Sequence, residues 1–159
     1  MKTRFFTFLL PCLLLAACGD DGTGAAARAS PTPSLPVATA LLDNGDESTL
    51  LTVEVAETPE QHERGFSGRT SLAEDRGIVF VFFEERDEAL ATDGLAVPLS
   101  IAFFDAEGTI LRIVDVEPCR YAGCAPADPG VAYMAALAVN RGSFDEWEIS
   151  EGDAVHLTR

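Results

Sequence analysis

The alternation of apolar and polar side chains predicts a domain built mainly of β-strands. Residues 49–56 (TLLTVEVA) alternate and are rich in Val, Leu and Thr, a pattern typical of a strand with one buried face. Residues 77–83 (GIVFVFF) form a continuous apolar run of strand length, which predicts a strand buried on both faces. Apolar runs on both sides of Gly108 predict a hairpin over residues 98–117, because glycine is free to adopt a positive φ in a tight turn.

Two short helical segments are predicted among these strands. Thr58 is a good N-cap, Pro59 suits the first helical position and Gln61 completes a capping box. This pattern predicts a short helix over residues 59–65, which ends at a glycine. A second helical turn is predicted within residues 142–150.

Two further strands are predicted towards the C-terminus. Residues 131–139 (VAYMAALAV) follow a Pro-Gly pair and have β-branched ends, which favours a strand over a helix. Residues 150–158 (SEGDAVHLT) predict a Gly-Asp turn and a short final strand. The predicted fold class is therefore mainly β (α+β), a small rolled sheet or barrel with one or two short helices.

The N-terminal residues have the pattern of a targeting segment. Two basic residues precede residues 5–15 (FFTFLLPCLLL), an apolar run of signal-peptide length that is too short to span a bilayer. Residues 15–18 (LAAC) resemble the lipobox of bacterial lipoproteins, in which the cysteine is lipidated before cleavage. We therefore predict a lipoprotein signal peptide over residues 1–17 and lipidation of Cys18, with an ordinary secretory signal as the alternative.

The residues after Cys18 have the composition of a tether. Residues 19–36 are mostly Gly, Ala, Ser, Thr and Pro, with too few large apolar side chains to bury a core. We therefore predict a lipidated cysteine and disordered tether over residues 18–36, followed by one globular β-rich domain over residues 37–159. This organisation predicts an exported protein that is lipid-anchored to the bacterial cell envelope, so the membrane is a predicted partner.

The four cysteines have separate predicted fates. Cys12 leaves with the signal peptide and Cys18 carries lipid, so Cys119 and Cys124 remain in an oxidising compartment. Their C-x4-C spacing differs from the C-x-x-C of thioredoxin-like sites, and no second pair or nearby histidine completes a zinc site. We predict a structural disulfide; a metal or redox site and a nucleophilic cysteine are the alternatives.

The charge of the chain disfavours several classes of partner. Without residues 1–17 the chain has nine basic residues, all arginine, and twenty-six acidic ones, which leaves a formal charge of −17. Nucleic acid and anionic lipid headgroups bind proteins through clusters of basic residues, so both are predicted to be poor partners. No calcium loop, P-loop or G-x-G-x-x-G motif occurs in the sequence, which predicts no cofactor and no metal site.

No catalytic constellation is visible in the sequence. His62 is expected at a solvated position on the predicted helix, and His156 is expected at the edge of the last strand. Ser67 lies in a Gly-Phe-Ser-Gly stretch, one residue short of a nucleophile elbow, and is predicted to lie in a turn. We therefore predict no catalytic residue.

Three stretches of the chain resemble the family called domain of unknown function 192. They read TVEVAETPEQHERGFSGRTSLAEDRGIVFVF, VPLSIAFFDAEGTILRIVDVEPC and LAVNRG, and the resemblance covers about Leu50 to Thr158. It is most specific at Arg64-Gly65, Gly68-Arg69, Pro98-Leu99, Glu117-Pro118-Cys119 and Val139-Asn140. The resemblance implies a compact, mainly β fold with a short early helix and frequent export. It implies no activity, because the family has no established one.

The chain departs from the family where a polar cleft would be expected. Family members typically carry F-W-M-K-N-T before a P-L-D-I strand, whereas this chain has LATDGL at residues 90–95 and Ser100 in place of the aspartate. Asp93 stands where the family has a lysine, and Ala138 where it has a glutamate. The departures imply a degenerate cleft that repels anions. Asp93 is then expected to shape a solvent-facing loop and Ser100 to be easily replaced.

These observations predict a membrane-tethered, non-catalytic module that binds a protein, a glycan or a small ligand, or has an accessory role in the envelope. The alternatives are a hydrolase-like enzyme and a carboxylate metal site. Both alternatives would use residues that form the candidate cleft: Arg64, Arg69, Asp93, Glu117 and Asn140. Convergence of Asp93, Glu117 and Asn140 in one pocket would favour an alternative.

Overall fold

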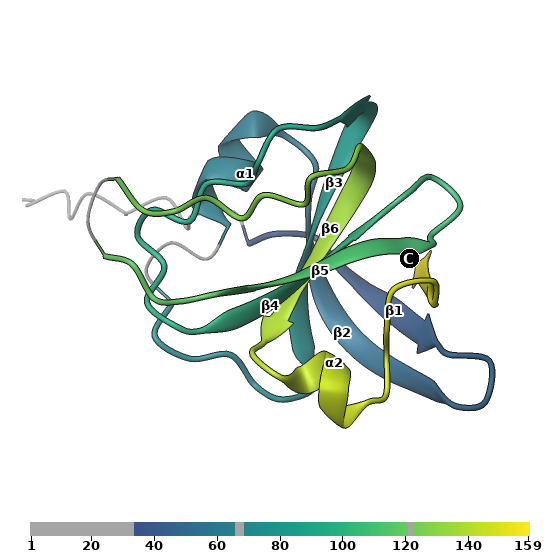
Figure 1. Ribbon diagram of the computed structural model, residues 1–159. Coiled ribbons are helices and arrows are strands. Elements are labelled where there is room, and N and C mark those ends of the chain that lie inside the picture. The colour runs from purple at the N-terminus through teal and green to yellow at the C-terminus, as the bar shows by residue number, and fades with distance from the viewer. Residues whose placement is uncertain (1–33, 66–68, 121–122) are drawn as a thin grey trace, which may run out of the picture. The chain divides into compact units, whose positions relative to one another are not determined.

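The computed structural model describes residues 34–65, 69–120 and 123–159, and the predicted signal peptide, Cys18 and Ser67 lie outside them. The described residues form a seven-stranded sheet curled into a half-barrel, with two short helices (Figure 1). The strands are β1 (Val37–Asp43), β2 (Ser48–Ala56), β3 (Arg76–Arg86), β4 (Leu99–Phe104), β5 (Ile110–Val116), β6 (Tyr133–Asn140) and β7 (Ala154–Thr158). Their order in the sheet is β5-β4-β6-β3-β2-β1-β7. The predicted fold class is confirmed.

The first helix, α1 (Pro59–Arg64), begins at the predicted cap. The Thr58 hydroxyl accepts a hydrogen bond from Gln61 N (3.3 Å), and Gln61 Oε1 accepts one from Thr58 N (3.0 Å). This helix lies in the connection between β2 and β3, which are parallel, whereas the other neighbouring strands pair antiparallel. Parallel strands need a long crossover, and the cap sets where the helix within this crossover begins. No helix of the described chain is long and apolar enough to span a bilayer.

Buried apolar side chains form two clusters on opposite faces of β4. The first cluster includes Ala102 and Phe104 of β4 and Phe144 of the second helix, α2 (Ser143–Glu146). The second includes Leu99 and Ile101, together with apolar side chains from the long connections after β3 and β5. Every residue of β4 is buried as a result. The candidate site lies beside the second cluster.

The prediction for the apolar run at residues 77–83 is wrong at its C-terminal end. Residues 77–80 are buried, but the Phe83 side chain is 84% exposed. The pairing of β3 with β6 changes register between Val81 and Arg86, so this end of the strand leaves the covered part of the sheet. The strand therefore extends past the core and carries Arg86 towards the pocket described below.

The predicted hairpin is confirmed, and its turn reaches the opposite edge of the sheet. Gly108 has a φ of 92°, and its carbonyl oxygen accepts a hydrogen bond from Val155 N (2.8 Å). Ile110 N donates to Asp153 O (2.8 Å). These contacts join the start of β5 to the start of β7, although β5 and β7 are the two edge strands of the sheet.

Candidate functional site

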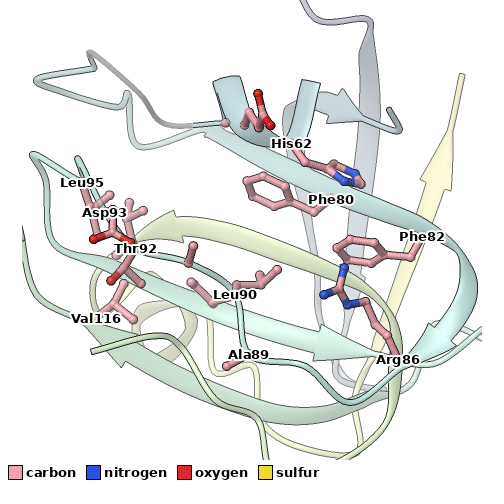
Figure 2. Close-up of a pocket in the computed structure, with 15 residues that line it drawn as sticks. His62, Phe80, Phe82, Arg86, Ala89, Leu90, Thr92, Asp93, Leu95 and Val116 are labelled. Carbon is pink, nitrogen blue, oxygen red and sulfur yellow. The ribbon is translucent and has the colours of Figure 1, made fainter. Parts of the chain in front are cut away.

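A pocket of about 350 Å³ opens between α1, the C-terminal half of β3 and the connection from β3 to β4 (Figure 2). Its floor is formed by apolar side chains of β4 and β5. The lining residues are His62, Glu63, Gly65, Phe80, Phe82, Arg86, Ala89, Leu90, Ala91, Thr92, Asp93, Leu95, Leu99, Ile101 and Val116.

One wall of the pocket is a row of flat side chains from α1 and β3. The His62 ring lies 4.7 Å from the Phe82 ring and 5.9 Å from the Phe80 ring, measured between centroids. The guanidinium carbon of Arg86 lies 4.4 Å from the Phe82 centroid, a cation–π contact. This row places one cationic group beside an apolar surface.

The structure corrects the prediction that His62 is solvated. Its side chain is half-buried, and Nε2 lies 3.0 Å from the carbonyl oxygen of Ala56 and 3.2 Å from that of Val81. Because both partners are acceptors, Nε2 must carry the hydrogen. These contacts connect α1 to the last residue of β2 and to the middle of β3, and the ring becomes part of the pocket wall.

Arg86 has an incompletely satisfied guanidinium. Its Nε atom is buried and makes no hydrogen bond to a described residue, although Glu88 Oε2 lies 3.1 Å away. The Arg86 side chain is 30% exposed and that of Glu88 67%, so this ion pair is a weak one. Because Nε is buried, a ligand in the pocket would bind the remaining N–H groups of the guanidinium.

The opposite wall is the segment over residues 90–95, which pairs with the loop that follows β5. Leu90 and Ala127 exchange two backbone hydrogen bonds of 2.9 Å, and Thr92 Oγ1 donates to Ala125 O (2.9 Å). Asp93 Oδ1 accepts a hydrogen bond from Gly123 N (3.1 Å). These bonds turn an irregular segment into an ordered wall.

The disulfide prediction is confirmed. Cys119 and Cys124 are bonded, with a Cα–Cα distance of 5.9 Å. Cys119 N also donates to the carbonyl oxygen of Leu95 (2.9 Å). The disulfide therefore closes the loop that supports the pocket wall. Asp93 is exposed in a turn, as expected, and its carboxylate also accepts a hydrogen bond from Gly123 N inside the disulfide-closed loop.

Most of the candidate cleft residues lie apart from one another. Arg69 pairs with Glu54 (2.5 Å), and Asn140 Nδ2 donates to Leu72 O (3.0 Å). Arg64 is half-buried in the last turn of α1. Of the five predicted residues, only Asp93 lines the pocket. Within the described chain, no group of three His, Cys, Asp or Glu side chains could hold a metal ion.

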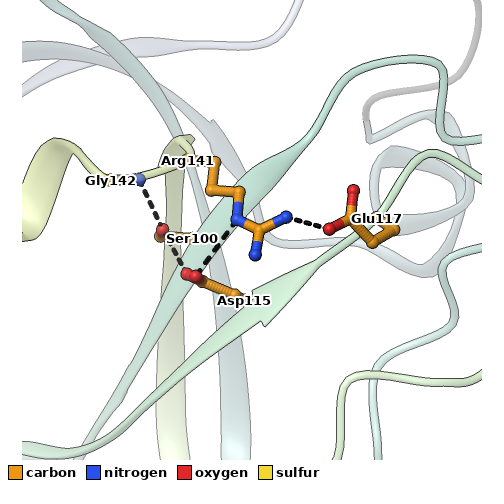
Figure 3. Close-up of polar contacts among 5 residues, drawn as sticks. All are labelled: Ser100, Asp115, Glu117, Arg141 and Gly142. Carbon is orange, nitrogen blue, oxygen red and sulfur yellow. Dashed lines mark hydrogen bonds and ion pairs between the residues drawn. The ribbon is translucent and has the colours of Figure 1, made fainter.

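Glu117 belongs to a second polar cluster, at the junction of β4, β5 and β6 (Figure 3). Ser100 Oγ donates to Asp115 Oδ1 (2.6 Å) and accepts a hydrogen bond from Gly142 N (3.0 Å). Arg141 Nε donates to Asp115 Oδ2 (3.2 Å), and its Nη1 donates to Glu117. The cluster joins three strands and the start of α2.

This cluster argues against the expectation that Ser100 is easily replaced, because Ser100 is buried and hydrogen-bonded. Its side chain is 2% exposed, and its hydroxyl connects a carboxylate to a backbone amide. The cluster contains no histidine to activate the hydroxyl, and Ser100 does not line the pocket. The hydroxyl links β5 to the start of α2.

Sequence reasoning missed Arg86, Phe80 and Phe82 as pocket residues. The apolar run over residues 77–83 indicated a strand in the core. Nothing in that pattern distinguished Phe80 and Phe82 from the other apolar residues of the run. The one available signal was Arg86 at the end of that run, an arginine among acidic residues.

Comparison with known proteins places the chain in a family. The family model named domain of unknown function 192 (DUF192, "Uncharacterized ACR") matches residues 40–157, and the chain belongs to this family. The segment over residues 90–95, where the chain departs from the family pattern, lines the pocket. No curated protein matches the chain.

Two crystal structures show the same fold. A proposed transcription regulator from Sinorhizobium meliloti 1021 has a TM-score of 0.72 and 27% identity, covering 79% of this chain and 96% of that one. A protein of unknown function from Novosphingobium aromaticivorans DSM 12444 has a TM-score of 0.70 and 20% identity, covering 80% of this chain and 89% of that one.

Proposed function

We propose that this member of the domain of unknown function 192 family is an exported binding domain, tethered to a membrane by lipid at Cys18, that takes up a small ligand. The pocket of about 350 Å³ is the observation that carries the proposal. It combines an apolar floor with a few polar groups, the usual composition of small-molecule sites, and its volume lies within their usual range. A pocket of this size suits a small ligand better than a glycan chain or a protein surface.

The positions of the candidate cleft residues favour binding over catalysis. A hydrolase needs a nucleophile, a base and a charge-stabilising group within hydrogen-bond reach of one another. Glu117 and Asn140 instead contact Arg141 and Leu72, away from the pocket that Asp93 lines. The same dispersal weakens a site in which these carboxylates share a metal.

The charge of the chain disfavours binding to nucleic acid. The Sinorhizobium relative is described as a proposed transcription regulator, which would suggest a DNA-binding role. This chain has a formal charge of −15, and phosphate backbones repel a protein of that sign. We therefore retain the small-ligand proposal.

The proposal is tested by screening small molecules for thermal stabilisation of the full chain in detergent micelles, because a ligand that binds only the folded state raises Tm. Ala91→Trp places a bulky ring on an exposed rim residue of the pocket. Ala106→Trp makes the same change at the exposed hairpin turn, outside the pocket.

We expect compounds that raise the Tm of the wild type to lose their effect on Ala91→Trp and to keep it on Ala106→Trp. A screen without stabilising compounds would contradict the proposal. Equal stabilisation of both variants would show that the ligand binds elsewhere.

A further inference from the structure

The pocket carries its charged groups in an ordered arrangement. Among its lining residues, Arg86 supplies a guanidinium, and Asp93 and Glu63 supply carboxylates. Arg86 and Asp93 lie at opposite ends of the pocket, with Phe80 and Leu90 between them (Figure 2). A ligand that fills the pocket therefore meets a cation at one end, an apolar middle and an anion at the other end.

The Arg86 end suits a carboxylate. Its guanidinium is oriented by contact with Phe82 and lines the pocket. Arginine binds carboxylates through two parallel hydrogen bonds, and these are among the stronger polar contacts in proteins. Glu88, the present neighbour of Arg86, is largely exposed and is free to turn into solvent.

The Asp93 end suits an amine. Asp93 is exposed, and its Oδ1 atom is held by the amide of Gly123 inside the disulfide-closed loop. The carboxylate is thus oriented before any ligand arrives, which lowers the entropic cost of binding. A protonated amine placed here gains a charge-assisted hydrogen bond.

The charge of the whole chain favours a zwitterionic ligand over a simple anion or cation. A formal charge of −15 repels a simple anion before it reaches Arg86. A simple cation that fills the pocket would meet the guanidinium of Arg86. A zwitterion has no net charge, so neither repulsion applies to it as a whole.

The volume limits the apolar part of the ligand. A cavity of about 150 Å³ is known to bind one benzene molecule, so about 350 Å³ has room for roughly two groups of that size. Apart from Arg86 and Asp93, the lining is mostly Phe and aliphatic side chains, with His62, Glu63 and Thr92 as its other polar members. Two apolar side chains on a short backbone match both the volume and the lining.

Resting on the proposed small-ligand function, we infer that the pocket binds a short apolar peptide with free termini, its carboxylate at Arg86 and its amine at Asp93. The peptide class follows from the combination of opposite charges at the two ends and apolar groups between them. A dipeptide with two aliphatic side chains is the simplest member.

The test uses leucyl-leucine and its three blocked forms, N-acetylated, C-amidated and blocked at both ends, titrated calorimetrically into the full chain in detergent micelles. We expect each single block to weaken binding about tenfold or more, the scale of one charge-assisted hydrogen bond. Equal affinity for all four forms would overturn the inference.

Variants assign each terminus to its residue. Arg86→Met should weaken binding of the free dipeptide about tenfold and should not weaken binding of the amidated form. Asp93→Asn keeps an oxygen acceptor for Gly123 N. It should weaken binding of the free dipeptide about tenfold and should not weaken binding of the N-acetylated form. Arg112→Met, a half-exposed arginine of β5 paired with Glu151, is the matched control and should bind like the wild type. The assignment of the carboxylate to Arg86 and of the amine to Asp93 would be overturned if only Arg112→Met lost binding. It would also be overturned if no variant lost binding.

The outcome separates this inference from the proposed function. If other compounds stabilise the wild type but not Ala91→Trp, while no form of leucyl-leucine binds, the pocket binds small ligands and the peptide inference is wrong. If neither the screened compounds nor any form of leucyl-leucine shows stabilisation or binding that depends on the pocket, the proposed function is wrong as well.

Discussion

At the scale of single residues, burial sets the pKa of Tyr133 and the contribution of Ser100 to stability. Tyr133 is fully buried, packs edge-on against Phe82 and Phe103, and donates a hydrogen bond to Glu88 O (2.8 Å). Burial raises the pKa of Tyr133 from 10.0 to about 12, because the phenolate is poorly solvated there. The neighbouring guanidinium of Arg86 opposes this increase in pKa.

The raised pKa of Tyr133 predicts a loss of stability in alkali. Between pH 10 and about 12 the unfolded state releases the phenolic proton while the native state keeps it, so the free energy of unfolding falls as pH rises through this range. Urea denaturation at several alkaline pH values measures this slope. Tyr133→Phe should show a smaller slope, and identical slopes would contradict the assignment.

Ser100→Ala should lower the free energy of unfolding by about 2 kcal/mol, because it removes a buried hydroxyl that makes two hydrogen bonds and leaves Gly142 N without its acceptor. Ser48→Ala is the control: Ser48 is exposed at the start of β2, and its change should cost less than about 0.5 kcal/mol. Denaturant unfolding compares the two. A cost for Ser100→Ala as small as the control's would favour the original expectation of an easily replaced residue.

Residue-level predictions from the sequence were weakest where burial comes from distant parts of the chain. Ser100 contacts Asp115 and Gly142, and His62 contacts the backbone of β2 and β3. No local pattern around either residue encodes these neighbours. The pocket was missed for the same reason, since its two walls come from α1 and β3 on one side and from residues 90–95 on the other.

At the scale of elements, local chemistry was a better guide. The capping box of α1 and the glycine turn between β4 and β5 involve residues close in sequence, and the structure has both where they were predicted. The strand β1 was not predicted, because VATALLD has small residues and weak alternation. It forms because β2 and β7 pair with it on both sides.

The disulfide staple should contribute to stability by restricting the unfolded chain. Changing Cys124 to Ser should lower the free energy of unfolding by about 2 kcal/mol, the value expected for a loop this short. Non-reducing peptide mapping should first find the Cys119–Cys124 cross-link in the wild type. Two freely alkylated thiols there would contradict the pairing.

Gly108→Ala should be more damaging than the same change at a comparable turn. A Cβ at Gly108 would lie 2.3 Å from Val155 O, and the backbone has a φ of 92°. We expect a loss of about 3 kcal/mol or more in the free energy of unfolding, from strain plus displacement of β7. Gly45→Ala has a similar φ of 88° with nothing within 4 Å, and should cost about 1 kcal/mol. Equal losses would show that the contact with Val155 is unimportant.

At the scale of the whole molecule, the proposed tether sets the location in which the pocket works. The acidic composition opposes close approach to anionic lipid headgroups, so a lipid chain and a spacer would be needed to keep the domain near the membrane. The proposal places this connection at Cys18.

Cys18→Ser should move the protein from the membrane fraction to the soluble or unprocessed pool, because the thiol that carries the lipid is gone. Fractionation followed by immunoblotting measures the distribution. Cys12→Ser, a change within the predicted signal peptide, is the matched control and should leave the distribution unaltered. Unchanged membrane partitioning of Cys18→Ser would rule out lipidation at that residue.

The pairing of β1 with β7 has a consequence for the order in which the domain assembles. Thr39 is opposite Thr158, so β1 obtains its second neighbour only after the chain up to Thr158 is available. Until then β1 presents a row of unpaired amide and carbonyl groups, which can recruit strands from other molecules. Contacts this distant in sequence also slow folding, because a long loop must close before they form. A chain interrupted before Ala154 would keep β1 permanently open and should aggregate, so the last five-residue strand protects the first one.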